Sequence, residues 1–379
     1  MPLHCLPLSP VQNGGAMFHL LSQFLQINYK MSTQEFRFEE LRGPLVDKFV
    51  KSNDNIYKYG LIKVWPSGCT FYPEYRNHAQ RIRDLEVRAD DVWIVTYPKC
   101  GTTWTQEMVW LLMNNLDYEK AGKILLTERS PFIEYSCLSG SEDLFQVGDT
   151  VAEVEELKSP RVVKTHLPLE LLPKQLWTVK PKVRTTTYCK SLLFSQFSHI
   201  QFFLGLVAQQ IIYVARGAKD VAVSYFHHHR LWNCYVGTCE DFVDAFIEGY
   251  PGYGSLWDHI LEFWKIRNEP YVLFNTFEEM KKDLPNVVQR TAKFLNKSLN
   301  CQQLQKLCEH LSFDSMKNNP WVNHDDELGK IARSTVNVEE RFMRKGQVGN
   351  WKSELTPQQA EKIDKWTDEK IKGTGYVLH

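Results

Sequence analysis

Short apolar runs rich in β-branched residues alternate with longer amphipathic segments along most of the chain. Four runs predict strands, at residues 92–96, 161–166, 211–215 and 271–274. Helical spacing recurs in residues 106–113, 218–226, 242–247, 256–264, 287–295 and 357–370. Strands that alternate with helices favour a parallel sheet. The pattern therefore predicts an α/β fold with a central, mostly parallel sheet flanked by helices.

Two stretches depart from this alternation. Residues 117–156 are expected to be loop-rich, and residues 40–90 hold a crowded set of rings without a clear period. Those rings are Tyr57, Tyr59, Trp65, Phe71, Tyr72 and Tyr75. The sequence leaves two interpretations open, because such rings either pack on the surface or line a site for an apolar acceptor.

Residues 183–210 also interrupt the alternation, and structureless insertions of this length are uncommon inside a compact domain. Joining Lys182 directly to Ile211 gives a loop that runs straight into a strand. We therefore interpret the segment as an insertion from a retained intron or a splice variant, and expect a protruding loop that lowers stability or activity. Its apolar part contains Gln196, His199 and Gln201, which argues against a membrane span.

Residues 1–30 are expected to be an N-terminal extension that is either disordered or absent from the native start. Their apolar part, residues 17–27, is too short and too polar to span a membrane, and it lacks the pattern of a secretory signal. A polar, helix-permissive segment begins at Met31. We therefore expect Met31 to be an alternative or true start, and residues 31–379 to hold the functional part.

Composition narrows the choice of partners. The 379 residues, 43% of them hydrophobic, can bury a large core as one big domain or two small ones. Lys plus Arg and Asp plus Glu balance at 45 each, so no overall attraction to nucleic acid or membrane is expected. Nine cysteines without a C-x-x-C pair favour reduced thiols in the cytoplasm.

A phosphate-like group is the expected ligand of the segment Tyr-Pro-Lys-Cys-Gly-Thr-Thr-Trp, residues 97–104, which follows the first predicted strand. Gly101 allows backbone N–H groups to converge at a helix N-terminus, and Lys99 with the two threonines adds donors. The lysine precedes the single glycine, unlike in a Walker A loop, which argues against an ordinary magnesium-dependent NTPase.

Three further motifs follow in order along the chain. They are Lys164-Thr-His-Leu-Pro168, Arg216-Gly-Ala-Lys-Asp-Val-Ala-Val-Ser224 and Arg344-Lys-Gly-x-x-Gly-x-Trp-Lys352. With the first loop they resemble the cytosolic sulfotransferases, in which that loop reads Tyr-Pro-Lys-Ser-Gly-Thr-Thr-Trp. The resemblance runs from Phe36 to the C-terminus apart from the insertion. It implies a single α/β domain, 3′-phosphoadenylyl sulfate (PAPS) as donor without a metal, and a small acceptor bearing a hydroxyl or amine.

The resemblance also implies roles for individual residues. The 5′-phosphosulfate would be held by Lys99, Cys100, Gly101, Thr102 and Thr103, and the 3′-phosphate by Arg216, Ser224, Arg344, Lys345 and Gly346. The adenine would stack on Trp104 and Phe313, with Phe277 standing where a tyrosine is usual; the acceptor pocket would include Phe132, His166 and His228. Cys100 is either a substitute for serine or an activated thiol.

Catalysis is expected to use His166 as general base, because its reference pKa lies near 6.5. Lys99 would stabilise the leaving oxygen and Lys164 the oxygens of the transferred group. These fixed cations replace magnesium. The consecutive histidines 227–229, with Cys234 and Cys239, do not predict a metal site, since neighbouring side chains on a helix point in different directions.

Two rival functions stay open. One is a catalytically impaired, nucleotide-binding splice variant, and the other is a P-loop-like nucleotide kinase that needs magnesium and ATP. A homodimer also stays open. Thr335, Val336 and Glu340 fit the dimerisation motif of the sulfotransferases, whereas Ile331 stands at its lysine position.

Overall fold

The computed structural model describes nine stretches of the chain. They are residues 35–53, 57, 59–138, 148–178, 182–183, 206–207, 210–325, 327–328 and 341–378. The expectations for residues 1–30, for Met31, for most of the 183–210 insertion and for the dimerisation motif at residues 331–340 fall outside them. The chain divides into two units, Met1–Glu35 and Phe36–His379, and all described helices and strands belong to the second.

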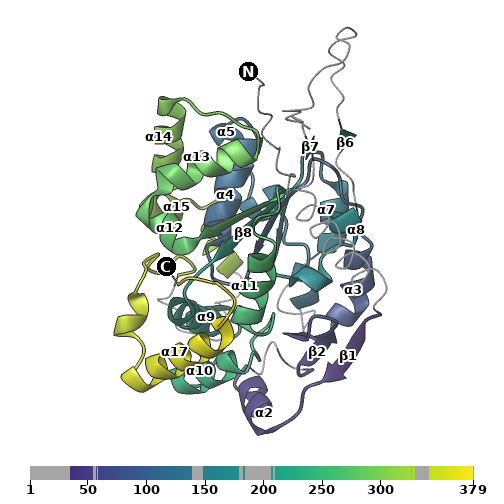
Figure 1. The fold of residues 1–379 in the computed structure, drawn as a ribbon, viewed down its shortest axis with the longest axis vertical. Helices are drawn as coiled ribbons and strands as arrows, with labels where there is room; N and C mark the ends of the chain where they lie inside the picture. Colours follow the sequence, from purple (N-terminus) through teal and green to yellow (C-terminus); the bar gives the residue numbers. More distant parts are fainter. Residues whose placement is uncertain are drawn as a thin grey trace, which may run out of the picture. The chain divides into compact units, whose positions relative to one another are not determined.

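A four-stranded parallel sheet forms the centre of that unit (Figure 1). Its strands lie in the order β5 (Val162–Thr165), β4 (Val92–Thr96), β8 (Gln210–Ala215) and β9 (Val272–Thr276). All five residues of β4 are buried, as expected for a strand covered on both faces. The predicted central parallel sheet is confirmed, and its strand bounds differ from the expected ones by at most two residues.

Helices cover both faces of the sheet because side chains alternate along each strand. On one face, Ile94 and Val214 share a core with α4 (Thr102–Met113) and α13 (Leu284–Phe294). On the other face, Tyr213 stacks on Phe263 of α11 (Leu256–Lys265) at 4.4 Å between ring centroids. The sheet is therefore the middle layer of three.

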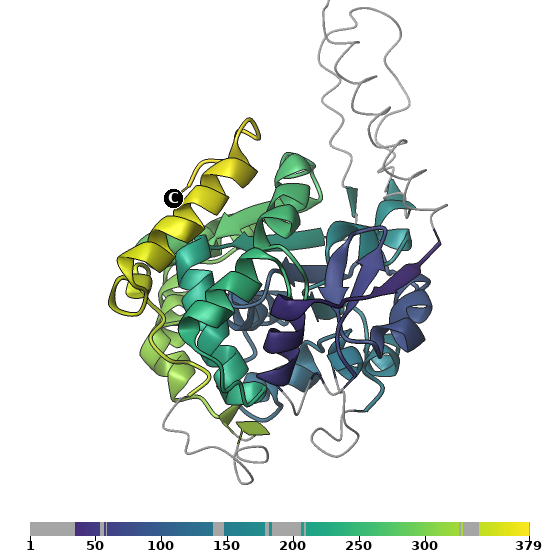
Figure 2. The ribbon, with the colours of Figure 1, turned by 90° about the horizontal axis from the view of Figure 1, so that it is seen from below.

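Further helices complete these layers. They are α9 (Ala218–Trp232), α10 (Cys239–Ile247), α12 (Phe277–Lys282), α14 (Cys301–His310), α15 (Phe313–Lys317), η3 (Asn350–Ser353) and α17 (Pro357–Ile371). Helices α9, α10 and α17 pack against one another, as Figure 2 shows. None of the helices in the described ranges is long and apolar enough to cross a membrane.

The aromatic-rich region forms a second, antiparallel sheet that the sequence pattern did not predict. Its strands β1 (Arg37–Glu40), β2 (Ile62–Trp65) and β3 (Cys69–Phe71) pair in that order, beside α2 (Pro44–Lys51) and α3 (Tyr75–Arg83). Strands of three or four residues are too short for an alternation to be recognised. Tyr57, Phe71 and Tyr75 are buried in packing contacts, and Tyr59 is exposed.

The expectation of loops over residues 117–156 was wrong for much of that stretch. It contains α5 (Tyr118–Ala121), α6 (Leu126–Arg129), η1 (Tyr135–Leu138) and α7 (Thr150–Glu156). These helices have four to seven residues, less than the window in which a helical period can be read. Two more short pieces, η2 (Leu169–Leu171) and α8 (Gln175–Thr178), follow β5.

The two ends of the insertion pair with each other. β6 (Lys182–Val183) and β7 (Leu206–Val207) are antiparallel, with Lys182 opposite Val207. This pairing brings the two ends of the insertion together shortly before β8 begins. There the Gln210 N–H donates to the carbonyl of Asp91, 3.0 Å away, directly before β4.

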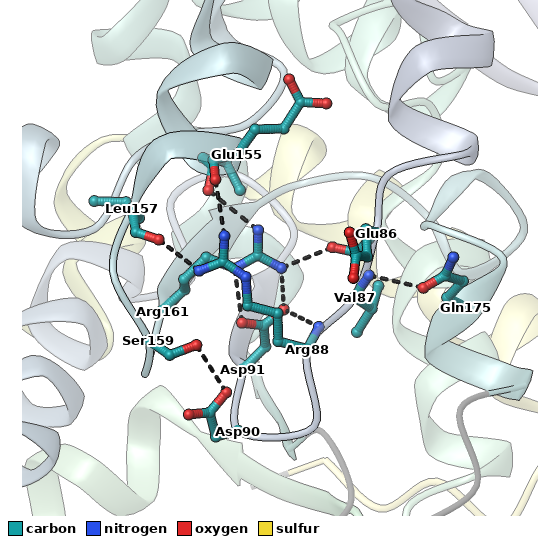
Figure 3. Close-up of polar contacts among 11 residues, drawn as sticks. Glu86, Val87, Arg88, Asp90, Asp91, Glu155, Leu157, Ser159, Arg161 and Gln175 are labelled. Atoms are coloured by element: carbon teal, nitrogen blue, oxygen red, sulfur yellow. Dashed lines mark hydrogen bonds and ion pairs between the residues drawn. The ribbon is translucent and has the colours of Figure 1, made fainter.

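A buried ion pair ties the amino ends of β4 and β5 together (Figure 3). The Arg161 guanidinium donates to both carboxylate oxygens of Asp91, with Nε 2.8 Å from Oδ1, and neither side chain is more than 1% exposed. Arg161 also donates to the carbonyls of Glu86 and Val154. The Arg88 N–H donates to Asp91 Oδ2 at 2.8 Å. This network fixes the amino ends of β4 and β5, at the opposite end of the sheet from the carboxyl ends of the strands.

Candidate active site

The loop after β4 has the shape of an anion cradle. Lys99 has φ 68° and Gly101 has φ 101°, so the backbone turns sharply before α4 begins at Thr102. Two features require glycine at position 101: its positive φ, and the Phe277 ring, which would lie only 3.0 Å from a Cβ. Helix α4 starts four residues earlier than the pattern predicted, and its first N–H groups therefore face the loop.

A cavity opens over this loop and collects most of the residues predicted to bind the donor. It is lined by Lys99, Gly101, Thr102, Thr103, Trp104, Arg216, Ser224, Phe277, Phe313, Arg344, Lys345 and Gly346, together with Lys164, His166, His228 and Phe342. We call it the donor cavity. It lies at the carboxyl ends of the parallel strands, where ligands of open α/β sheets bind.

Cys100 is the one predicted donor residue whose side chain does not line the donor cavity. Its thiol is fully buried, with Sγ 3.8 Å from the Pro98 carbonyl oxygen. Burial raises the pKa of this thiol, which is the opposite of what an activated thiol requires. The activated-thiol interpretation was therefore wrong, and only the backbone amide of Cys100 is left to serve the site.

Two buried lysines bring positive charge into the cavity. Burial, together with repulsion from Lys164, Arg216 and Arg344, lowers the pKa of Lys99 to about 7. Burial lowers the pKa of Lys164 to about 8. Within the described residues, neither ammonium has a hydrogen-bond partner. Lys99 Nζ lies 4.1 Å from the centroid of the Phe342 ring, and Lys164 Nζ lies 4.0 Å from that of Phe132.

Three other cations of the cavity donate hydrogen bonds to nearby oxygens. Arg216 donates from Nη1 to the Lys99 carbonyl at 3.0 Å, whereas its buried Nε has no partner among the described residues. Arg344 and Lys345 both donate to Glu354 Oε1, at 2.7 and 3.0 Å. Burial alone would raise the pKa of Glu354, but the hydrogen bonds from these cations lower it to about 2.

Aromatic rings supply flat apolar surface beside the cations. Trp104 meets Phe277 edge to face at 5.8 Å between centroids. Phe313 lies against the backbone of Gly346, where a Cβ would come within 2.3 Å of the ring. Cations next to aromatic rings that line the same cavity suit a purine nucleotide with several phosphate groups. The residues present therefore fit PAPS.

A second cavity, which we call the acceptor cavity, adjoins the first. Its lining includes Tyr72, Phe132, Tyr135, Tyr225, Trp232 and Tyr253. The two cavities share Pro98, Lys164, His166, His228 and Phe342. Phe132 and His228, which were predicted for the acceptor pocket, line this second cavity, and His166 lies at the junction of the two.

Hydrogen bonds fix the tautomer of His166. Its Nδ1 lies 2.7 Å from the Thr96 carbonyl oxygen, which can only accept. Nδ1 therefore carries the hydrogen, and Nε2 keeps its lone pair. Burial and the nearby charge of Lys164 lower the pKa of His166 well below its usual value. The imidazole is neutral at physiological pH, as a general base must be before it takes a proton.

The three consecutive histidines of α9 diverge. His227 contacts Glu354, His228 lines both cavities, and the buried His229 lies 3.1 Å from the Tyr57 hydroxyl. In the described part of the chain, no group of three or more potential metal ligands comes together.

Sequence reasoning missed several residues that complete the site. Phe342 lines both cavities and lies two residues before the motif that begins at Arg344. Asp220 lies within another motif and accepts from the N–H groups of Gly349 and Trp351. Glu134 accepts from the backbone N–H of His166 at 2.6 Å. Phe342 and Asp220 could have been found from their positions near or within recognised motifs. Glu134 could not, because its contact with His166 joins distant parts of the chain.

Comparisons with known proteins agree with this geometry. The sulfotransferase domain family matches residues 89–186 and 191–375. Luciferin sulfotransferase from Photinus pyralis is 36% identical over 313 residues, which cover 80% of this chain and 77% of that protein. Sulfotransferase 1B1 from Canis lupus familiaris is 36% identical over 306 residues, which cover 79% and 90% of the two chains.

A solved structure supports the same assignment. Retinol dehydratase in complex with retinol and PAP is 29% identical, with a TM-score of 0.76 over 91% of this chain and 99% of that chain. PAP is the nucleotide that PAPS leaves after losing its sulfuryl group. The chain therefore belongs to the sulfotransferase family, and it is an enzyme that transfers a sulfuryl group from PAPS to small-molecule acceptors.

Proposed function

We propose that the acceptor is a small apolar phenol or sterol-like alcohol and that His166 is the general base. The observation that carries this proposal is the position of His166 at the junction of the donor and acceptor cavities. A base at that point can reach an acceptor hydroxyl while that hydroxyl faces the donor.

In this proposal, the bound donor supplies the sulfuryl group. The acceptor oxygen forms a bond to sulfur, the bond between sulfur and the bridging phosphate oxygen breaks, and the hydroxyl proton passes to His166 Nε2. Lys99 neutralises charge on the leaving oxygen, and Lys164 stabilises the transferred oxygens. Both ammonium groups line the donor cavity and lack competing hydrogen-bond partners among the described residues, which supports these roles.

The residues of the donor cavity divide into two anion sites in the same proposal. Lys99, Gly101, Thr102 and Thr103, with the backbone amide of Cys100, hold the 5′-phosphosulfate. The 3′-phosphate is held by Arg216, Ser224, Arg344, Lys345 and Gly346, and the adenine by Trp104, Phe277 and Phe313. The partly free guanidinium of Arg216 and the fixed pair Arg344 and Lys345 support the second site.

The aromatic lining of the acceptor cavity supports the choice of acceptor class. Retinol dehydratase has been solved with retinol and also with androsterone. Both ligands are apolar molecules with a hydroxyl group. An amine acceptor remains an outcome of the test below.

We further propose that residues 31–379 act as one sulfotransferase domain in the cytoplasm, interrupted by the 183–210 insertion, with residues 1–30 as an extension outside the domain. Homodimerisation stays a prediction from the motif at residues 331–340. The pairing of Lys182 with Val207 brings the two ends of the insertion together, which supports a deletion that joins Lys182 to Ile211.

A transfer assay with labelled PAPS tests the proposal. The full chain and a variant lacking residues 183–210 are compared on a panel of phenols, sterols and amines. We expect transfer to phenols or sterols, with higher activity and stability in the shortened chain. Transfer to amines alone would contradict the acceptor class. PAP binding without transfer by the full chain, together with transfer by the shortened chain, would indicate the impaired splice variant. Transfer of phosphate from ATP with magnesium would favour the kinase.

A further inference from the structure

A buried carboxylate lies directly behind the proposed base. Glu134 is fully buried and follows the segment that runs beside β5, where Phe132 pairs with Lys164 in parallel. Its Oε1 accepts from the backbone N–H of His166 at 2.6 Å, and its Oε2 accepts from the Thr165 hydroxyl at 2.8 Å. The carboxylate therefore holds both Thr165 and His166, with one oxygen bound to each residue.

The same peptide is held from its other side. His259 Nε2 lies 3.0 Å from the His166 carbonyl oxygen, and His259 Nδ1 lies 2.8 Å from the Tyr213 hydroxyl. Since the carbonyl oxygen only accepts, His259 is the donor in the first of these bonds. The backbone of His166 is thus fixed at its N–H by Glu134 and at its carbonyl by His259.

Burying this carboxylate is costly. Burial raises the pKa of Glu134 to about 7, although its bonds to His166 and Thr165 oppose that rise. The cost of burying a carboxylate has to be offset by its hydrogen bonds, and an apolar side chain of similar size would avoid that cost. The hydrogen bonds of Glu134 come from the backbone N–H of His166, the proposed base, and from the hydroxyl of Thr165, the residue before it.

We infer that Glu134 is a positioning residue for sulfuryl transfer: it holds the Thr165–His166 peptide so that the imidazole faces the junction of the two cavities. The inference rests on the proposed role of His166. Glu134 lines neither cavity, so it acts through its neighbours: it accepts hydrogen bonds from Thr165 and His166, and its charge opposes the lowering of the Lys164 pKa.

The test compares substitutions that remove the hydrogen bonds with substitutions that keep them. Glu134→Leu fills the space but leaves the His166 N–H without an acceptor. Glu134→Gln can accept from that N–H and donate its amide hydrogen to the Thr165 oxygen. We expect kcat to fall about ten- to a hundredfold in Glu134→Leu and less than about fivefold in Glu134→Gln, with the Kd for PAP within about twofold in both.

Glu262 provides a matched control. It also accepts a backbone N–H of the chain after β5, that of Leu169 at 2.9 Å, and burial raises its pKa to about 8. It has no hydrogen bond to His166 in the described structure. Glu262→Leu should lower thermal stability as Glu134→Leu does, while kcat of the folded protein stays within about twofold of the parent value.

Three results would overturn the inference: a kcat in Glu134→Leu within twofold of the parent, equal losses in Glu134→Leu and Glu262→Leu, or equal losses in the Leu and Gln variants of Glu134. Should Glu134→Leu fail to fold, Thr165→Val removes one of the two bonds and Thr165→Ser keeps it. The valine variant should then lose several-fold in kcat that the serine variant retains. If His166→Ala keeps near-normal turnover while Glu134→Leu does not, the base assignment fails separately.

Discussion

The lowered pKa of Lys99 makes the affinity for PAP depend on pH in a calculable way. The pKa is about 7 in the ligand-free protein, so the ammonium loses its proton as the pH rises through 7. An anion binds the charged form better, and binding is therefore strongest below pH 7 and weakens above it. The phosphate groups of PAP do not offset this trend, because their second ionisation, near pH 6, is nearly complete by then.

The size of the effect follows from linkage. If bound phosphate keeps Lys99 charged up to pH 9, Kd rises in proportion to 1 + 10^(pH − 7), or roughly fifty-fold between pH 7 and 9. Lys164, with a pKa of about 8, steepens the rise above pH 8 if its ammonium also contacts the nucleotide. Burial is the first cause of both shifts, so salt should screen the effect only weakly.

Isothermal titration calorimetry at pH 7, 8 and 9, in two buffers of different ionisation enthalpy, measures Kd and proton uptake together. Uptake should approach one proton per PAP above pH 7. Lys99→Met should bind PAP more weakly, and its Kd should no longer depend on pH between pH 7 and 8. Lys99→Arg keeps its positive charge throughout this range, so its Kd should not depend on pH either. A Kd that stays constant from pH 7 to 9, or that changes equally in Lys99→Met, would refute the assigned charge state.

Three further substitutions probe the fold and the donor cavity. Arg161→Met leaves the buried Asp91 carboxylate unpaired and should cost about 3–5 kcal/mol in urea denaturation; a loss under about 1 kcal/mol would contradict the role of this pair. Phe277→Tyr adds a hydroxyl that can hydrogen-bond the adenine, so calorimetry should show PAP binding two- to tenfold tighter, and weaker binding would argue against adenine at this ring. Gly346→Ala forces a Cβ into the Phe313 ring at a positive φ and should weaken PAP binding about tenfold in the same assay, so unchanged binding would place the nucleotide elsewhere.

The central sheet could be predicted because its strands are buried on both faces and therefore read as continuous apolar runs. The run Val-Trp-Ile-Val-Thr of β4 is an example, and its predicted bounds match the observed ones. The donor cavity could be anticipated for a different reason: its residues lie in short motifs whose order along the chain is itself informative. Lys99, Arg216 and Arg344 come together as expected.

The rest depends on contacts that a local pattern does not encode. The strands of the antiparallel sheet and the helices between residues 118 and 156 are too short to show a period. Glu134 becomes meaningful only when the fold places it against His166, 32 residues further along the chain. The same holds for Cys100, which was either a substitute for serine or an activated thiol. Its side-chain direction separates these interpretations, and that direction follows from the turn and not from the identity of its neighbours.

The most direct test of the account is the turnover of His166→Ala with labelled PAPS and a phenol that the parent protein accepts. The account predicts that most of the turnover is lost while the Kd for PAP stays close to that of the parent, because the nucleotide is held by other residues. Near-normal turnover in this variant would contradict the assignment of His166 as the base at the junction of the two cavities.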